Sequence, residues 1–268
     1  MAALKGEEFA MRNVLAVAGK EMRAYFHSPI AYLVMTVYTL LCGYFFYSFT
    51  AVYVVQGFRM QAMGGAGAPP MSLNEMVMRP MLEGILTVVL LLLVPLITMR
   101  LYAEEKRSGT IELLLTSPLT DLEIILGKFL GALGLYAILV ALTFGYFSVL
   151  YVFGTPNAKP LLAYALGFFL FGGALLALGM WFSTFTKNQI IAGSISLAAF
   201  LLLYVLDWGT AYSTSKWSQV LSSLALTPHF DNFAKGVIDL GDVFYYLSVI
   251  GLGIFFTARS VEALKGRP

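Results

Sequence analysis

Charged residues are scarce in this sequence: Asp, Glu, Lys and Arg make up 12% of its 268 residues, against about a quarter in soluble domains. Hydrophobic residues make up 59%, and the mean hydropathy is +0.80. A water-soluble domain of this composition would expose large apolar patches and aggregate. The same figures exclude an intrinsically disordered chain, a collagen-like fibre and a disulfide-rich secreted module. We therefore predict an integral membrane protein.

The residue types that several kinds of site require are also missing or too few. The one cysteine, Cys42, cannot form an internal disulfide. The two histidines, His27 and His229, lie far apart in the sequence, so we expect no metal site. A net charge of +2 provides no basic surface for nucleic acid. Gly127-Lys128 lacks the upstream glycine of a P-loop, so we expect this chain to bind no nucleotide and no other cofactor.

Six apolar stretches are long enough to cross a membrane, which takes about 20 residues for a hydrocarbon core about 30 Å thick. The predicted spans are residues 30–55, 81–101, 125–153, 161–183, 189–206 and 243–258. None of them carries a charge at its centre, which argues against an ion-coupled carrier and a charge-lined channel. The expected fold is an all-α integral membrane domain covering residues 1–268, with six transmembrane helices.

The basic residues predict the orientation of these spans. An even number of spans places both termini on one side of the membrane. With that side cytoplasmic, twelve of the 17 Lys and Arg residues are cytoplasmic, in agreement with the positive-inside rule. The expected location is the inner membrane of a bacterial cell, with a multi-pass topology and both termini in the cytoplasm.

Residues 9–27 are predicted to form an amphipathic helix at the membrane interface. Its apolar face, at a spacing of three to four residues, consists of Met11, Val14, Leu15, Ala18, Met22, Tyr25 and Phe26. Its polar face carries Arg12, Asn13, Lys20 and Arg23. Ser28-Pro29 is expected to end the helix, because a helical conformation is disfavoured before a proline. A membrane-surface anchor and a docking helix are both consistent with this pattern.

The loop at residues 102–124 joins the second and third spans, and its charges are dense for so apolar a chain. Local signals predict a short helix held between the two spans. They are Gly109 ending the second span, Thr110 as a cap with Glu112 behind it, Ser117-Pro118 as a stop, and a capping box of Thr120 and Glu123 opening the third span. Three adjacent leucines, Leu113, Leu114 and Leu115, favour docking to a protein over lying flat on lipid.

Four charges precede this short helix: Glu104, Glu105, Lys106 and Arg107. We place them at the cytosolic end of the second span, where they either pair with one another or with a partner protein, or form a solvated surface. Gly127 and Gly131 have the spacing of a close helix–helix contact in the third span. Pro95 predicts a kink in the second.

The segment at residues 207–242, between the fifth and sixth spans, has two helical periodicities and predicts short helices at the outer leaflet. The first includes Trp217, Val220, Leu221 and Leu224. The second begins at Thr227-Pro228 and includes Phe230, Phe233, Ala234 and Val237. Residues 64–70, in the first outer loop, are rich in glycine and proline and predict turns.

The stretch from Glu105 to Pro118, continuing to Lys128, resembles the first cytoplasmic loop of ABC-2-type transporter permeases. The stretch from Thr227 to Tyr246 is similar to the last outer segment of the branch associated with gliding motility and multicopper-enzyme maturation. The resemblance covers essentially the whole chain. It implies that Gly109, Thr110, Ile111, Glu112 and Leu113–Leu115, up to Pro118, form the coupling helix that contacts an ATPase. It also makes residues 9–26 a connecting helix and residues 184–189 a second small contact.

The function that the resemblance implies is a permease subunit that moves a substrate, expected to be exported, across the cell membrane. ATP and magnesium would be bound by a separate ABC ATPase subunit. The other expected partners are a second permease copy, identical or related, an auxiliary extracytoplasmic protein and the lipid bilayer. An alternative is a non-transporting platform or regulator that transmits the ATPase motion to an extracytoplasmic machine. An ATP-independent channel or scaffold ranks last, because it leaves the charged loop unexplained.

Overall fold

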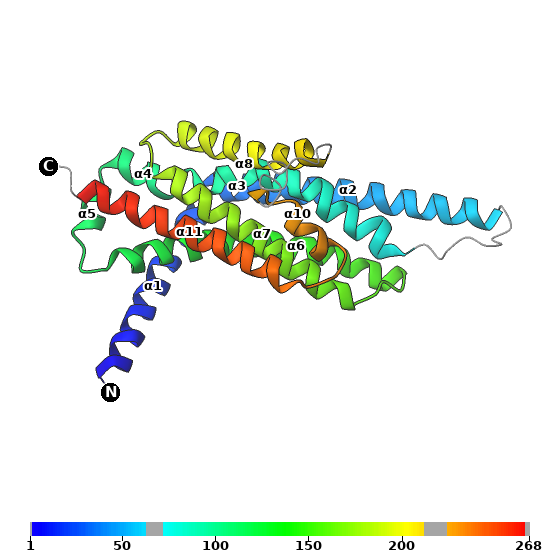
Figure 1. The fold of residues 1–268 in the computed structure, drawn as a ribbon, viewed down its shortest axis with the longest axis horizontal. Coiled ribbons are helices and arrows are strands. Elements are labelled where there is room, and N and C mark those ends of the chain that lie inside the picture. The colour runs from blue at the N-terminus through cyan, green and yellow to red at the C-terminus, as the bar shows by residue number, and fades with distance from the viewer. Residues whose placement is uncertain (1, 63–71, 212–223, 266–268) are drawn as a thin grey trace.

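The computed structural model describes residues 2–62, 72–211 and 224–265 (Figure 1). Within these ranges the chain forms helices and no strands. Six helical stretches are long and apolar enough to cross a membrane, which confirms the predicted all-α membrane fold. They are Pro29–Ala62, Asn74–Ser108, Asp121–Phe153, Lys159–Ser183, Gln189–Leu206 and Leu240–Lys265.

The spanning helices run along the long axis of the molecule, and both described ends of the chain lie at the end that carries α5 (Figure 1). The α-helices are α1 (Ala2–His27), α2 (Pro29–Ala62), α3 (Thr87–Thr98), α4 (Arg100–Ser108), α5 (Ile111–Leu115), α6 (Asp121–Phe153), α7 (Lys159–Ser183), α8 (Gln189–Ala211), α10 (Pro228–Ala234) and α11 (Leu240–Lys265). Helix α1 leaves the bundle at the α5 end, and α2 extends farthest at the opposite end (Figure 1).

The second span is irregular and longer than its apolar stretch. It opens with two segments of wide π-helical turns, η1 (Asn74–Met78) and η2 (Met81–Leu86), before α3 begins. Pro95 lies in α3, four residues before the break at Met99 that separates α3 from α4. Because α4 continues the span to Ser108, this region carries the charged residues 104–107 directly on the end of a membrane helix.

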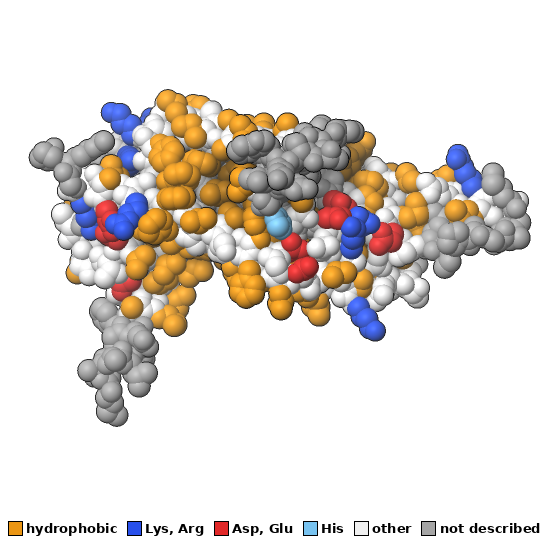
Figure 2. All heavy atoms as spheres, viewed as in Figure 1, with side chains coloured by type: hydrophobic (Ala, Val, Ile, Leu, Met, Phe, Trp, Pro, Cys, Tyr) orange, Lys and Arg blue, Asp and Glu red, His pale blue; other side chains and the backbone are white. Residues whose placement is uncertain are grey.

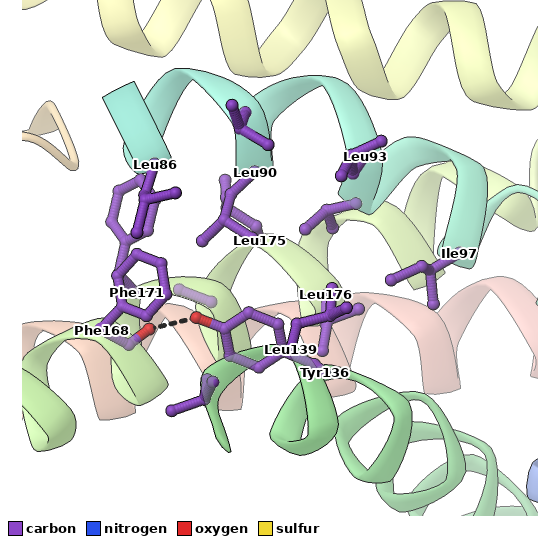
Figure 3. Packing of buried hydrophobic residues seen from close by; sticks show 14 of the residues in the cluster. Leu86, Leu90, Leu93, Ile97, Tyr136, Leu139, Phe168, Phe171, Leu175 and Leu176 are labelled. Atoms are coloured by element: carbon purple, nitrogen blue, oxygen red, sulfur yellow. Dashed lines mark hydrogen bonds between the residues drawn. The ribbon is translucent and has the colours of Figure 1, made fainter. Parts of the chain in front are cut away.

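The core lies where α3, α6 and α7 meet (Figure 3). The buried side chains drawn there include Leu86, Leu90, Leu93 and Ile97 from the second span, Tyr136 and Leu139 from α6, and Phe168, Phe171, Leu175 and Leu176 from α7. The Tyr136 hydroxyl donates to the Phe168 carbonyl. A buried tyrosine hydroxyl needs such a partner. These contacts join spans two, three and four into the body that carries the loop at residues 102–124.

Hydrophobic side chains cover much of the middle of the face shown in Figure 2, while charged side chains gather near the α5 end and around α10. The apolar windows of α2 and α8 are only 22% and 17% buried within the chain. Such surfaces suit lipid or another apolar helix.

Of the two short helices predicted between spans five and six, the second is present as α10, which begins at Pro228 and buries Phe230 and Phe233. The prediction for Trp217, Val220 and Leu221 lies outside the described residues. The turns predicted at residues 64–70 lie outside them as well.

Candidate functional site

Helix α5 is a short helix held between two sharp stops. Gly109 ends α4 in the left-handed conformation, with φ of 75°, which glycine adopts without strain. Ile111 packs partly against the core, whereas Glu112 and Leu113 point into solvent, Leu113 with 72% of its surface exposed. The Thr110 hydroxyl lies 2.8 Å from that of Ser108. The helix therefore presents an acidic and an apolar side chain at the end of the molecule.

The capping box predicted at the start of the third span is confirmed. The Glu123 carboxylate accepts from the Thr120 backbone N–H at 2.7 Å, and the Thr120 hydroxyl accepts from the Glu123 N–H at 3.3 Å. Glu123 also accepts from the Asn13 side chain at 3.0 Å, which links the cap to α1. The loop after α5 therefore ends at Thr120, which caps the start of α6.

The charged residues 104–107 contact partners along α4 and on other parts of the fold. Glu104 pairs with Arg100 at 3.0 Å, one turn back on the same helix. Glu105 pairs with Lys128 of α6 at 2.7 Å and with Lys20 of α1 at 3.5 Å. The other two are Lys106, which donates to the Thr184 carbonyl, and Arg107, which is exposed. Two of the four charges therefore connect α4 to other parts of the fold.

Lys128 is the centre of this arrangement, with 1% of its surface exposed. Its ammonium group donates to Glu105 at 2.7 Å, to the Leu101 carbonyl at 2.8 Å and to Glu21 of α1 at 3.0 Å. It also lies 5.2 Å from the centre of the Tyr102 ring. We call Lys128, Glu21, Glu105 and the Leu101 carbonyl the Lys128 cluster. A buried ammonium is stable only when its protons are paired in this way.

Glu21 supplies the contribution of α1 to the cluster, and it is ionised there. Burial raises the pKa of its carboxyl group, but the charge of Lys128 and the hydrogen bond from it outweigh burial, with a smaller contribution from Lys20. The pKa of Glu21 therefore lies below its ordinary value of 4.5. Lys20, more than half exposed, lies 3.4 Å from Glu21 and balances the charge of the cluster.

The glycine spacing in the third span is used to bring α1 against α6. A Cβ atom added at Gly127 would lie 2.5 Å from the Val17 Cβ, and one at Gly131 would lie 2.6 Å from the Glu21 Cβ. Neither distance is compatible with a side chain, so these positions must stay small for the helices to meet. The close approach also brings the Glu21 carboxylate within reach of Lys128.

The face of α1 that packs on α6 is not centred on the predicted apolar face. Met11 and Leu15 remain 67% and 60% exposed, whereas Val17 and the charged Glu21 are buried. The helix is turned so that its contact face follows the small residues of α6 and the ion pair, rather than the centre of its own apolar stripe. Because it packs on α6, α1 is a structural part of the loop region.

A serine at the end of α7 closes the break in the second span. The Ser183 hydroxyl accepts from the backbone N–H groups of Tyr102 and Ala103, at 3.0 and 3.2 Å, and donates to the Met99 carbonyl at 3.1 Å. These backbone groups would otherwise be buried and unsatisfied at the break. The turn that follows α7 is joined to α4 by the Lys106–Thr184 contact, so it belongs to the same region.

From the sequence, Lys128 was named only in the incomplete P-loop match and in the loop resemblance, and neither Glu21 nor Ser183 was singled out. The sequence does contain a pattern that favours an ion pair between Glu21 and Lys128. Glu21 lies four residues after Val17 and four before Tyr25, on one helical face, and Lys128 directly follows Gly127. A charge on an otherwise apolar contact face predicts an opposite charge on its partner helix. For Ser183 the sequence offers no comparable signal.

A second polar group lies at the opposite end of the molecule. Arg79 lies 2.9 Å from Glu83 and 3.1 Å from Asp231 of α10, which ties α10 to the start of the second span. His229 lies 2.7 Å from Asp242 and stacks on the Tyr245 ring at 3.7 Å. Neither set forms a cluster of three or more potential metal ligands within the described residues.

A sequence profile of the family described as ABC-2 family transporter protein matches residues 15–256. No curated protein matches the chain. The matched region begins within α1 and ends within α11. It contains the loop with α5, the Lys128 cluster, and the first five described helices that can span a membrane, with part of the sixth. The members of this family are membrane subunits that lack a nucleotide-binding domain of their own. Membership of the family therefore implies an ABC ATPase as partner. The chain therefore belongs to the ABC-2 transporter family and is a membrane permease of an ABC transporter.

Proposed function

We propose that this permease exports a substrate across the inner membrane of a bacterial cell, driven by ATP hydrolysis in a separate ATPase subunit that binds ATP and magnesium. The α5 end faces the cytoplasm in this proposal, and both termini are cytoplasmic. The resemblance of residues 227–246 favours the gliding-motility and multicopper-enzyme-maturation branch.

The observation that carries this proposal is the Lys128 cluster. The cluster joins α4, which precedes α5 in the chain, to α6, which follows it. It also attaches α1 to these two helices. A short helix between two helices that are fixed to each other transmits a displacement into both spans, as mechanical coupling requires. We assign α5 as the coupling helix and α1 as the connecting helix beside it.

The surface that would contact the ATPase combines the tip of α5 with the exposed charges next to it. Glu112 and Leu113 are exposed on α5, Arg107 on α4, and Arg12 and Arg23 on α1. A central apolar side chain surrounded by charges of both signs is typical of a protein-binding surface. The turn at residues 184–189 would form a smaller second contact.

A second permease copy would complete the transport pathway. The apolar windows of α2 and α8 are about four-fifths unburied within one chain, so they offer surfaces for a partner helix or for lipid. We propose a dimer of identical or related permeases, each on one ATPase subunit.

The proposal is tested with the variants Glu112→Lys and Leu114→Pro in the complex purified with its native ATPase. Membrane insertion should be unchanged. The ATP-dependent change in thiol labelling of a cysteine placed at Val88, an exposed position on α3, should be lost. Glu262→Lys is the control, because Glu262 is an exposed carboxylate of α11, outside the proposed contact. A wild-type response to ATP in either α5 variant would contradict the role of α5.

One observation favours the alternative of a platform for an extracytoplasmic machine. Helix α2 has 34 residues, or about 51 Å at 1.5 Å per residue, well beyond a core of about 30 Å. Near its far end Phe58 is 68% exposed, which suits contact with an auxiliary protein. Substrate-stimulated ATPase activity of the purified complex supports transport, whereas ATPase activity that responds only to the auxiliary protein supports the platform.

A further inference from the structure

A cavity of about 330 Å³ lies between α2, the start of the second span and the end of α6, far from α5. Its polar lining includes Thr50, Ser72, Asn74, Thr155 and Asn157, and no charged residue lines it. Leu150 and Phe153, in the last turn of α6, form part of its apolar wall. Since α6 ends here, the cavity lies at the level where the hydrocarbon core gives way to headgroups.

The polar wall of this cavity contains one hydrogen-bonded pair and one hydroxyl group without a partner among the described residues. The Asn74 amide donates to the Asn157 carbonyl at 3.0 Å and accepts from the Asn157 N–H at 2.8 Å. The Thr50 hydroxyl oxygen, by contrast, is buried and has no hydrogen-bond partner among the described residues. Buried hydroxyl groups are normally paired, so a ligand hydroxyl fits at this position.

An apolar hollow of about 480 Å³ lies along the same two helices, nearer the middle of the membrane. It is lined by Thr39 of α2 and by residues of α6 that include Leu142, Gly145 and Val149. Gly145 and Val149 are exposed, so the hollow opens to the lipid-facing surface. Val149 lines the hollow and Phe153, one turn farther along the same face of α6, lines the cavity, which places the two spaces next to each other on α6.

We propose that these two spaces hold one amphipathic molecule, with an uncharged, hydroxyl-bearing headgroup in the cavity and a hydrocarbon chain in the hollow. The absence of charge in the lining excludes a phosphate headgroup, because an anion buried without a cation is strongly disfavoured. A membrane glycolipid and a transported lipid share this chemistry. The site does not depend on the function proposed for α5.

The test uses the complex in phosphatidylcholine nanodiscs with two photoactivatable probes that carry the same acyl chains. One is a monoglucosyl diacylglycerol and the other a phosphatidic acid, each with a diazirine in one chain. The glucosyl probe should label peptides from residues 138–149 in preference to the phosphatidic acid. Thr50→Val should lower this preference by about fivefold, the value of one hydrogen bond.

Gly145→Leu should remove labelling by both probes, since it fills the hollow. Gly251→Leu is the matched control, because a side chain at either glycine meets open space within the chain. Equal labelling by the two probes, or labelling that Gly145→Leu leaves unchanged, would overturn the proposal.

Addition of ATP and magnesium then distinguishes a resident membrane glycolipid from a transported lipid. Loss of the bound probe identifies a cargo and retention identifies a resident lipid, and either result supports the site.

Discussion

The ammonium group of Lys128 contacts oxygen atoms from α1 and α4. Its removal leaves the Glu21 and Glu105 carboxylates with the more distant, largely exposed Lys20 as their shared cation. Breaking a buried ion pair on one side costs about 3–5 kcal/mol. We therefore expect Lys128→Met to lower the apparent melting temperature strongly in detergent, measured by the fluorescence of a thiol-reactive or intrinsic probe.

Lys159→Met is the control for this experiment, because Lys159 is exposed and its loss should have little effect. The double variant Glu21→Gln with Lys128→Met should recover part of the stability, because it leaves one carboxylate, Glu105, for the one remaining cation, Lys20. If Lys128→Met melts like the wild type, the cluster does not stabilise the α5 end.

The pKa of Glu21 gives a pH dependence at the same site. Because that pKa is lower in the folded protein than its ordinary value of 4.5, the ionised carboxylate stabilises the fold fully above pH 4.5. The stabilisation is lost as the pH falls through the folded-state pKa. We expect Glu21→Gln to reduce the loss of melting temperature between neutral and acidic pH. Glu262→Gln, at an exposed carboxylate, should leave the profile unchanged.

At the scale of elements, the contact of α1 with α6 depends on the absence of side chains at Gly127 and Gly131. A leucine at position 127 would overlap Val17, and overpacking of this kind costs about 1–3 kcal/mol. We expect Gly127→Leu to release α1 from α6 and to speed tryptic cleavage after Lys20 and Arg23. Gly57→Leu, at an open position on α2, should not. Equal cleavage of both variants would show that α1 is held by other contacts.

The same elements show why some features could be predicted and others could not. The stop at Gly109 and the capping box of Thr120 and Glu123 are local, so their signals lie within a few residues of sequence. The contact face of α1 is set by Glu21 and by its partner Lys128, 107 residues away. A tertiary ion pair outweighs the apolar pattern there, and no local rule contains it.

At the scale of the molecule, the proposed orientation predicts which residues a membrane-impermeant thiol reagent reaches from outside. In a Cys42→Ser background, a cysteine at position 159 should react in intact cells. A cysteine at position 107 should react only after the inner membrane is permeabilised. The reverse pattern would place the α5 end outside. Native Cys42 is buried, so it should react little itself, and its replacement removes the remaining background labelling.

The number of spans and the fold class could be predicted because each span is a continuous apolar stretch. The extra length of the second span could not be predicted from the sequence. It begins at Asn74 and ends at Ser108, and both of these parts contain charged residues whose burial depends on partners elsewhere, such as Lys128 and Asp231. The cavity beside Thr50 could not be predicted either, because it forms between segments about 25 and 100 residues apart.

The length of α6 has a consequence for how far a small movement at α5 reaches. Its 33 residues span about 50 Å. The Lys128 cluster fixes α6, two turns from its start, to α1 and α4. With the coupling role that we propose for α5, a displacement of α5 would therefore turn the three helices as one lever. A rotation of about 5° about Lys128 displaces the other end of α6 by about 3 Å, because the 25 residues from Lys128 to Phe153 add about 1.5 Å each. That end carries Leu150 and Phe153, so the lever widens or narrows the gap between α6 and α2 where the cavity lies.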